Sequence, residues 1–171
     1  MSDDKFTMST NPDDWPDGLP PCLIGVDKEG RLWHYGAEMI HKGINRMLME
    51  HVELDEKGRY IIDFNKQRCY VEVEDTFFVI LSTEIQSDGR GNIERCTLIL
   101  NDGNQEELDP ATLYIGRENV LYAMVKQGGF PARFVRPAYY QLAERILEKD
   151  DRFILPFKGR DYPLVERENE A

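Results

Sequence analysis

Short runs of alternating apolar and polar residues, separated by glycine-containing turns, make up most of the chain and predict an α+β fold. Apolar runs flank Asp27-Lys-Glu-Gly30 and Gln86-Ser-Asp-Gly-Arg-Gly-Asn92 in the way that strands flank the loop of a β-hairpin. We expect about ten short, mainly antiparallel strands. The clearest are residues 22–26, 32–35, 59–64, 68–73, 77–85, 93–100, 112–115 and 120–125.

Two stretches have the apolar spacing of an amphipathic helix. In the first, between Glu38 and Val52, the residues at this spacing are Ile40, Ile44, Met47, Leu48 and His51. The second begins with Pro137, which suits a first helical turn, and its apolar positions are Ala138, Leu142 and Ile146. We expect each helix to pack its apolar face on the core.

The two halves of the chain share a pattern that predicts an internal repeat. The aligned pairs are residues 22–50 with 120–148, residues 59–64 with 152–157, and Arg68-x-Tyr70 with Arg160-x-Tyr162. Each copy reads as two strands, a helix and two further strands, and one copy alone would bury few of its apolar residues. We therefore predict two pseudo-repeats packed about an approximate twofold axis.

The predicted organisation is one folded domain with acidic ends. Residues 1–21 are acidic and rich in proline, so we expect a flexible lead-in. The folded domain spans residues 22–164 and consists of repeat one (22–75), a central hairpin (76–110) and repeat two (111–164). Residues 165–171 form an acidic tail.

The net charge of −11 argues against two classes of partner. Nucleic acid requires a concentration of Lys and Arg that this sequence lacks, and an anionic membrane surface repels an acidic chain. No run approaches the ~18 apolar residues of a membrane span, and the acidic start is unlike a signal peptide. The expected location is the cytoplasm.

Three cysteines, Cys22, Cys69 and Cys96, lie far apart within apolar runs. Their odd number and wide spacing are untypical of a disulfide framework. We interpret them as small buried hydrophobic residues of a protein in a reducing compartment.

Four segments together resemble a bacterial family, the domain of unknown function 1285 (DUF1285) family. They are Asp27-x-Glu-Gly-Arg-Leu-Trp-His-Tyr-Gly36, Gly58-Arg-Tyr60, Val73-Glu-Asp-x-x-Phe-Val79 and Ala132-Arg-Phe-x-Arg-Pro-Ala-Tyr-Tyr-x-Leu142. The resemblance spans roughly residues 22–164. It implies a soluble protein with a repeated α/β motif, and a role in signal transduction has been suggested for the family without an established ligand or reaction.

The chain departs from the family pattern at two places. Asp63-Phe-Asn-Lys66 stands where members usually carry a Thr-Pro-x-Glu-like stretch, and His41-Lys42 stands where they carry an Arg near the first helix. The resemblance therefore implies the fold more strongly than any site built on these positions.

Arginine and tyrosine side chains recur in the two copies and are the candidate ligand-binding residues. Arg59, Arg68 and Tyr70 align with Arg152, Arg160 and Tyr162. A guanidinium group binds a carboxylate or phosphate through two hydrogen bonds. We therefore predict a groove between the repeats for a small anionic ligand or a protein partner, lined by Arg133, Arg136, Tyr139, Arg160, Tyr162 and Asp75. The alternative is that these arginines form internal salt bridges, for example with Glu72 or Glu148.

The acidic residues around the end of the first copy suggest a second function, that of a hydrolase. Alternation along Cys69-x-Val71-x-Val73 places Glu72 and Glu74 on the opposite, solvated face of a strand. Asp75 is the exception, because the alternation breaks there, so the enzyme hypothesis uses Asp75 with a histidine. No nucleophile elbow or phosphate-binding loop occurs in the sequence.

We predict neither a metal nor a cofactor. His34, His41 and His51 all fall in the first copy, but their spacing does not place two of them on one helix face, as a zinc site would require. A third hypothesis is a structural protein that pairs its open sheet edges between subunits, for example as a homodimer.

Overall fold

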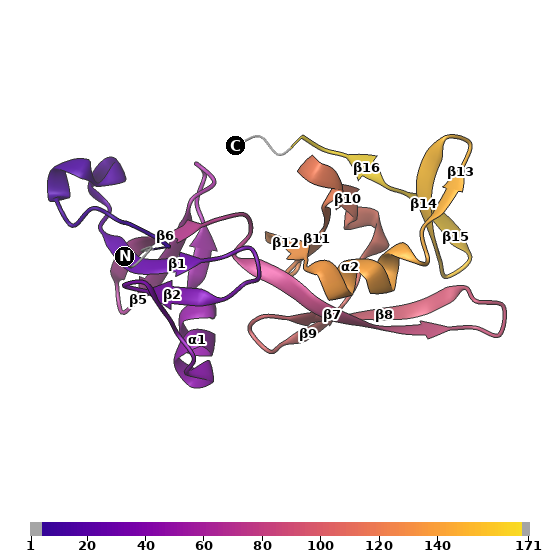
Figure 1. Ribbon diagram of the computed structural model, residues 1–171, viewed down its shortest axis with the longest axis horizontal. Coiled ribbons are helices and arrows are strands. Elements are labelled where there is room, and N and C mark those ends of the chain that lie inside the picture. Colours follow the sequence, from indigo (N-terminus) through magenta and orange to yellow (C-terminus); the bar gives the residue numbers. More distant parts are fainter. Residues whose placement is uncertain (1–4, 169–171) are drawn as a thin grey trace. The chain divides into compact units, whose positions relative to one another are not determined.

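A computed structural model describes residues 5–168, and the chain divides after Phe77 into two compact units. Unit 1 ends at Phe77 and unit 2 begins at Phe78. Figure 1 shows that strands dominate both units. Among the described residues, each unit contains one α-helix. Among the described residues there are sixteen strands, two α-helices and four short 3-10 helices.

Unit 1 is built on a six-stranded sheet with the order β3-β2-β1-β6-β5-β4. Its elements are β1 (Pro21–Val26), β2 (Leu32–His34), β3 (Ala37–Glu38), α1 (Lys42–Met49), β4 (Val52–Leu54), β5 (Tyr60–Phe64) and β6 (Gln67–Val73). Neighbours pair antiparallel except β1 and β6, which pair parallel. The buried apolar side chains of this sheet, including Val26, Leu32, Ile61 and Val71, form the core of the unit.

A disulfide joins the central strands of unit 1 and corrects the interpretation of the cysteines. Cys22 on β1 and Cys69 on β6 are bonded across the parallel pair. Cys96 is the buried hydrophobic residue that the sequence predicts, and burial, followed by the nearby Glu107, raises the pKa of its thiol to about 12. Disulfides persist in oxidising surroundings, so the reducing compartment loses its support.

The start of the chain contacts unit 1. Two short 3-10 helices, η1 (Pro12–Asp14) and η2 (Pro16–Gly18), precede β1. The indole of Trp15 donates a hydrogen bond to the carbonyl oxygen of Ser9 and closes this segment on itself. Further upstream, the ring of Phe6 lies against the backbone of Gly25 on β1. Whether the lead-in is flexible remains a prediction.

Unit 2 is built on a larger sheet with the order β13-β14-β8-β7-β12-β11-β10-β16, to which β15 adds beside β14 and β9 beside β8. The elements are β7 (Phe78–Ser87), β8 (Ile93–Leu100), β9 (Gln105–Glu107), η3 (Pro110–Thr112), β10 (Tyr114–Ile115), η4 (Arg117–Asn119), β11 (Leu121–Val125), β12 (Phe130–Phe134), α2 (Arg136–Ala143), β13 (Leu147–Lys149), β14 (Arg152–Phe157), β15 (Arg160–Pro163) and β16 (Val165–Glu166).

The sheet of unit 2 is mixed, whereas the sequence predicts mainly antiparallel strands. β7 and β8 form a long antiparallel hairpin, but β12 pairs parallel with β7, β14 with β8, and β16 with β10. The hairpin thus brings together strands from two later segments of the chain, which local patterns do not reveal. The coarser prediction, an α+β fold of many short strands and two helices, is confirmed.

Helix α2 is fixed on β7 by apolar and polar contacts. Ala138 and Leu142 are fully buried. The side-chain oxygen of Gln141 accepts hydrogen bonds from the backbone N–H and the hydroxyl of Thr83 on β7. The register of β7 against β8 shifts between Ile80 and Ser82, just before this contact. The pairing of β7 with β12 ends at Ile80, and beyond it the helix satisfies the backbone N–H of Thr83.

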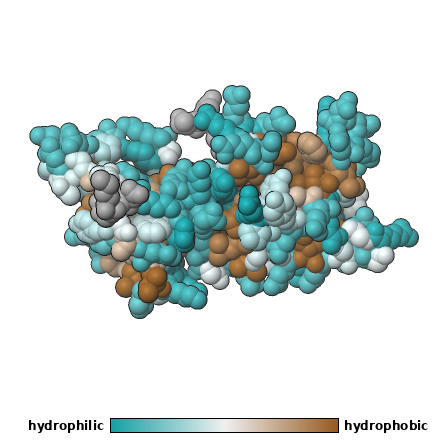
Figure 2. Space-filling view, viewed as in Figure 1, coloured by the Kyte–Doolittle hydropathy of each residue, from teal (hydrophilic) through white to brown (hydrophobic). Residues whose placement is uncertain are grey.

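Helix α1 does not bury the face that the sequence predicts. Met49 is its buried residue, whereas Ile44 is 46% exposed and Met47 39%. Ile40, which lies just before the helix, is 83% exposed. Figure 2 shows this part of unit 1 as an apolar patch on the surface. The prediction was wrong because the spacing identifies an apolar face without identifying the element that covers it.

The two units repeat the order of elements but not the pairing of strands. Strand, strand, helix and three strands follow one another in β1–β6 and again from β11 to β15, when the two-residue β3 is set aside. In unit 1 the first strand pairs directly with the last, whereas in unit 2 β7 and β8 stand between β12 and β14. The internal repeat therefore remains a prediction. Neither α-helix within residues 5–168 is long and apolar enough to cross a bilayer.

Candidate functional site

Two hairpins of unit 1 use the same carboxylate-centred turn. Asp27 accepts hydrogen bonds at Oδ1 from the backbone N–H groups of Glu29 and Arg31, and at Oδ2 from Nε of Arg31. Asp55 accepts the equivalent bonds from Lys57 and Arg59. A glycine with positive φ precedes each arginine, so Asp-x-x-Gly-Arg is a local code for this turn. In these turns arginine is a structural residue.

The carboxylate of Asp27 accepts further hydrogen bonds from outside its turn. Besides the turn, its Oδ2 accepts hydrogen bonds from the indole of Trp33 at 2.9 Å and the ammonium of Lys5 at 3.0 Å. The residue is fully buried, and burial alone would raise its pKa. The hydrogen bonds from Arg31, Trp33 and Lys5 outweigh burial and lower the pKa to about 2. Asp27 therefore stays ionised at neutral pH.

Asp75 lies beside a shallow hollow of about 260 Å³ in unit 1. The hollow is lined by Gly58, Arg59, Tyr60, Tyr70, Val71, Val73 and Asp75. The guanidinium group of Arg59 in this lining already forms ion pairs, because it lies 2.7 Å from the carboxylate of Asp55 and 2.9 Å from that of Asp17. The hydrogen bond to Asp55 leads the interactions that raise the pKa of Arg59. An anionic ligand would therefore have to compete with Asp17 and Asp55 for this group.

The break in alternation at Asp75 has a structural explanation. Residues 74–77 form bends between β6 and β7, and the boundary between the two units follows directly at Phe77. Glu72, which the sequence places on a solvated face, is half-buried, and burial raises the pKa of its carboxyl group. Tyr70 beside it on β6 has a raised pKa, through burial and then through the charges of Glu72 and Asp14.

The three histidines have local structural roles. Nδ1 of His41 accepts a hydrogen bond from the backbone N–H of Ile44 and caps α1. Nδ1 of His34 lies 3.0 Å from the carbonyl oxygen of Leu23, and Nδ1 of His51 lies 2.7 Å from that of Met47. Within residues 5–168, no group of three or more His, Cys, Asp and Glu side chains is arranged to hold a metal ion.

The other five predicted site residues belong to unit 2 and form two groups. Arg133 on β12, with Arg136 and Tyr139 on α2, makes up the first. Arg160 and Tyr162 on β15 make up the second. Figure 1 shows β13–β15 beyond the C-terminal end of α2, away from its first turn. For the described residues, no hydrogen bond, ion pair or ring contact joins Arg136 or Tyr139 to the second group.

The hairpin register separates Arg160 from the arginine with which the sequence aligns it. β5 and β6 pair Phe64 with Gln67, and β14 and β15 pair Phe157 with Arg160. Phe64 and Phe157 are aligned residues, so Arg160 corresponds to Gln67 rather than to Arg68. A shift of one residue turns a side chain to the other face of a strand. The recurring Arg-x-Tyr therefore does not mark equivalent positions.

Several residues important for unit 1 were missed by the sequence analysis, namely Lys5, Phe6, Gly25, Asp27 and Trp33. Asp27 had a local signal, since Gly30 and Arg31 complete its turn. No local sequence pattern indicates the roles of Lys5 and Phe6, because their contacts with Asp27 and Gly25 depend on how the lead-in crosses unit 1.

Comparison with known proteins supports the predicted resemblance. No protein-family model and no curated protein matches the chain. A solved structure of a DUF1285 family protein from Silicibacter pomeroyi DSS-3 has a TM-score of 0.69 at 18% identity, covering 92% of this chain and 90% of that chain. A DUF1285 family protein from Shewanella baltica OS155 has a TM-score of 0.58 at 14% identity, covering 71% and 91%. At these identities the likeness concerns the fold, and the chain has the fold of the DUF1285 family proteins that it resembles.

Proposed function

We propose that the protein is a binding module, and that unit 2 binds a small anionic ligand or an acidic segment of a partner protein. The supporting observation is a difference in how arginines are used. In unit 1, Arg31, Arg59 and Arg68 all form ion pairs with carboxylates. Across the described residues, Arg136 and Arg160 of unit 2 form none. Exposed arginines without internal partners are free to bind an anion.

The solvent-facing side of α2 is the better-built candidate surface. Arg136, Tyr139 and Tyr140 are spaced so that they share one face of the helix, while Ala138 and Leu142 occupy the buried face. Tyr140 is 56% exposed, and its ring meets that of Tyr139 edge to face at 5.6 Å. Aromatic rings beside an arginine provide apolar contact and hydrogen-bonding hydroxyls around the charge.

The experiment is a thermal-shift screen of the whole chain with carboxylate and phosphate metabolites, followed by anisotropy with a labelled polyglutamate peptide. A species that binds the native form raises the melting temperature. We expect Arg136→Ala and Arg160→Ala each to weaken binding. Arg90→Ala, in the exposed turn between β7 and β8, is the charge-matched control. Unchanged affinity in both arginine variants would remove the proposal.

The other parts of the functional hypothesis need separate tests. A role in signalling and a cytoplasmic location remain predictions, and the disulfide between Cys22 and Cys69 is an observation against a reducing compartment. The hydrolase hypothesis needs a histidine beside Asp75, and among the described residues no histidine lines the hollow next to Asp75. Sedimentation at rising protein concentration tests the homo-oligomer hypothesis.

A further inference from the structure

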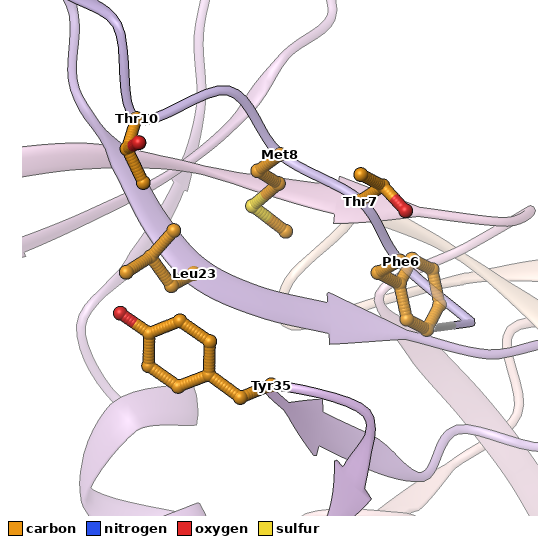
Figure 3. A pocket seen from close by; sticks show the side chains of 6 residues that line it. All are labelled: Phe6, Thr7, Met8, Thr10, Leu23 and Tyr35. Carbon is orange, nitrogen blue, oxygen red and sulfur yellow. The ribbon is translucent and has the colours of Figure 1, made fainter. Parts of the chain in front are cut away.

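Residues 5–10 cross unit 1 beside β1 and are attached to it through side chains. Figure 3 shows Met8 and Thr10 directed from this segment towards Leu23 on β1, with Tyr35 completing the pocket. The pocket has a volume of about 180 Å³. Within residues 5–168, no backbone-to-backbone hydrogen bond joins the segment to β1. A segment held in this way can be released without breaking a strand ladder.

Lys5 occupies a site built for an ammonium group. Its Nζ lies 3.0 Å from Oδ2 of Asp27, 3.7 Å from Oε1 of Glu74 and 5.0 Å from the centre of the Trp33 ring. Two carboxylates and the face of an indole are a strong combination for recognising a cation. Because Asp27 is fully buried and its carboxylate is oriented by the turn, this site is held in place by the fold.

Phe6 occupies a slot that depends on a glycine. A Cβ atom at Gly25 would fall inside the ring of Phe6, so the ring lies directly on the backbone of β1. Beyond it, Leu23 has a positive φ of 59° within β1, at the point where the register against β6 shifts. Non-glycine residues keep this conformation where the surroundings fix it, commonly at ligand clamps.

We propose that unit 1 carries a groove for an extended peptide in which a lysine is followed by an aromatic residue, and that residues 5–10 occupy this groove in cis. The partner is a protein segment of the same chemistry, which competes with Lys5 and Phe6 for the ammonium site and the slot. The acidic character of the chain favours a basic partner. This inference concerns the opposite unit and the opposite ligand charge from the proposed function, so either can fail alone.

The test uses the whole chain and a fluorescein-labelled peptide, Lys-Phe-Thr-Met-Ser-Thr, which copies residues 5–10. A tethered competitor acts at millimolar effective concentration, so we expect the Lys5→Ala, Phe6→Ala double variant to bind the peptide at least ~10-fold more tightly than the unmodified chain. Lys28→Ala, an exposed lysine near the groove, is the matched control and should bind like the unmodified chain. Peptides with Glu for Lys or Ala for Phe should bind weakly to every protein.

Melting curves establish that the double variant is folded. If the folded double variant fails to bind the peptide, or binds the two altered peptides equally well, the segment is a fixed part of unit 1 and the proposal is overturned. The unmodified chain could instead form a concentration-dependent dimer that the double variant does not form. That result would overturn the proposal of a separate protein partner, because the groove would then bind a second copy of the chain.

Discussion

The two helices have similar apolar spacing and opposite surroundings. Leu142 of α2 is fully buried, whereas Ile44 of α1, with which the sequence aligns it, is 46% exposed. The difference arises because α2 packs on β7, which covers the face that carries Leu142. In α1 the buried residue is Met49, and the face that carries Ile44 is partly exposed. Similar sequence patterns thus produce unlike packing when one unit has an additional hairpin to supply the cover.

The largest contrast is expected from truncating these two side chains. Leu142→Ala should lower the free energy of unfolding by about 2 to 5 kcal/mol, because it removes a fully buried side chain and leaves a cavity. Ile44→Ala should cost less than about 1 kcal/mol, because the side chain is already half in water. Urea unfolding measures both, and equal losses would show that α1 is covered in solution.

The disulfide provides the second way to separate the units. Cys22 and Cys69 are 47 residues apart in sequence, and losing the link should destabilise unit 1 by about 2 to 4 kcal/mol through the entropy of the unfolded chain. Urea unfolding with and without a reducing agent measures this effect. The double variant Cys22→Ala, Cys69→Ala is the control, since a reducing agent should leave it unchanged. No effect on the unmodified chain would mean that the link contributes little.

The third contrast uses the buried carboxylates. The folded-state pKa of Asp27 is about 2, below its ordinary value of 3.8, so its network contributes stability above that value and loses it as the pH falls towards 2. The contribution of this network to the free energy of unfolding at neutral pH is about 2 kcal/mol. The stability difference between the unmodified chain and Asp27→Asn should therefore narrow by that amount on acidification from neutral pH to about 2. A stability difference that does not change with pH would contradict the lowered pKa of Asp27.

Asp102 of unit 2 is the matched residue for this measurement. Burial alone would raise its pKa, and the hydrogen bonds from Lys126 and Asn104 lower it. Asp102→Asn should show the same direction of pH dependence, so the two variants report on the two units separately. Residual structure detected by circular dichroism at low pH would identify the unit that survives acid.

The parts of the fold that follow from neighbouring residues could be predicted from the sequence. Asp27-x-x-Gly-Arg31 and Asp55-x-x-Gly-Arg59 carry the hydrogen-bonding groups of their turns, so the hairpins they close are readable. The disulfide was not readable, because it depends on the parallel pairing of β1 with β6. The cover of α2 depends on β7, which lies far upstream in the chain.

The candidate site was predictable only in part for the same reason. The sequence supplied arginines and tyrosines, but their ion pairs with Asp17 and Glu53 depend on how distant segments meet. The sequence aligns Arg160 with Arg68 because the Arg-x-Tyr motif occurs in both copies. The strand register instead makes Gln67 the counterpart of Arg160. A one-residue difference in a turn is small in an alignment and decisive for the direction of a side chain.

The parallel pairing of β1 with β6 also determines how unit 1 carries mechanical load. β1 is the first strand of this sheet along the chain and β6 is the last. Tension applied to the two ends of the chain therefore pulls β1 at its N-terminal end and β6 at its C-terminal end. Two parallel neighbours pulled in this way slide past each other, so their hydrogen bonds resist together instead of opening one by one. With Cys22 bonded to Cys69 across this pair, the sheet cannot be drawn out fully while the bond persists. We therefore expect unit 1 to resist stretching.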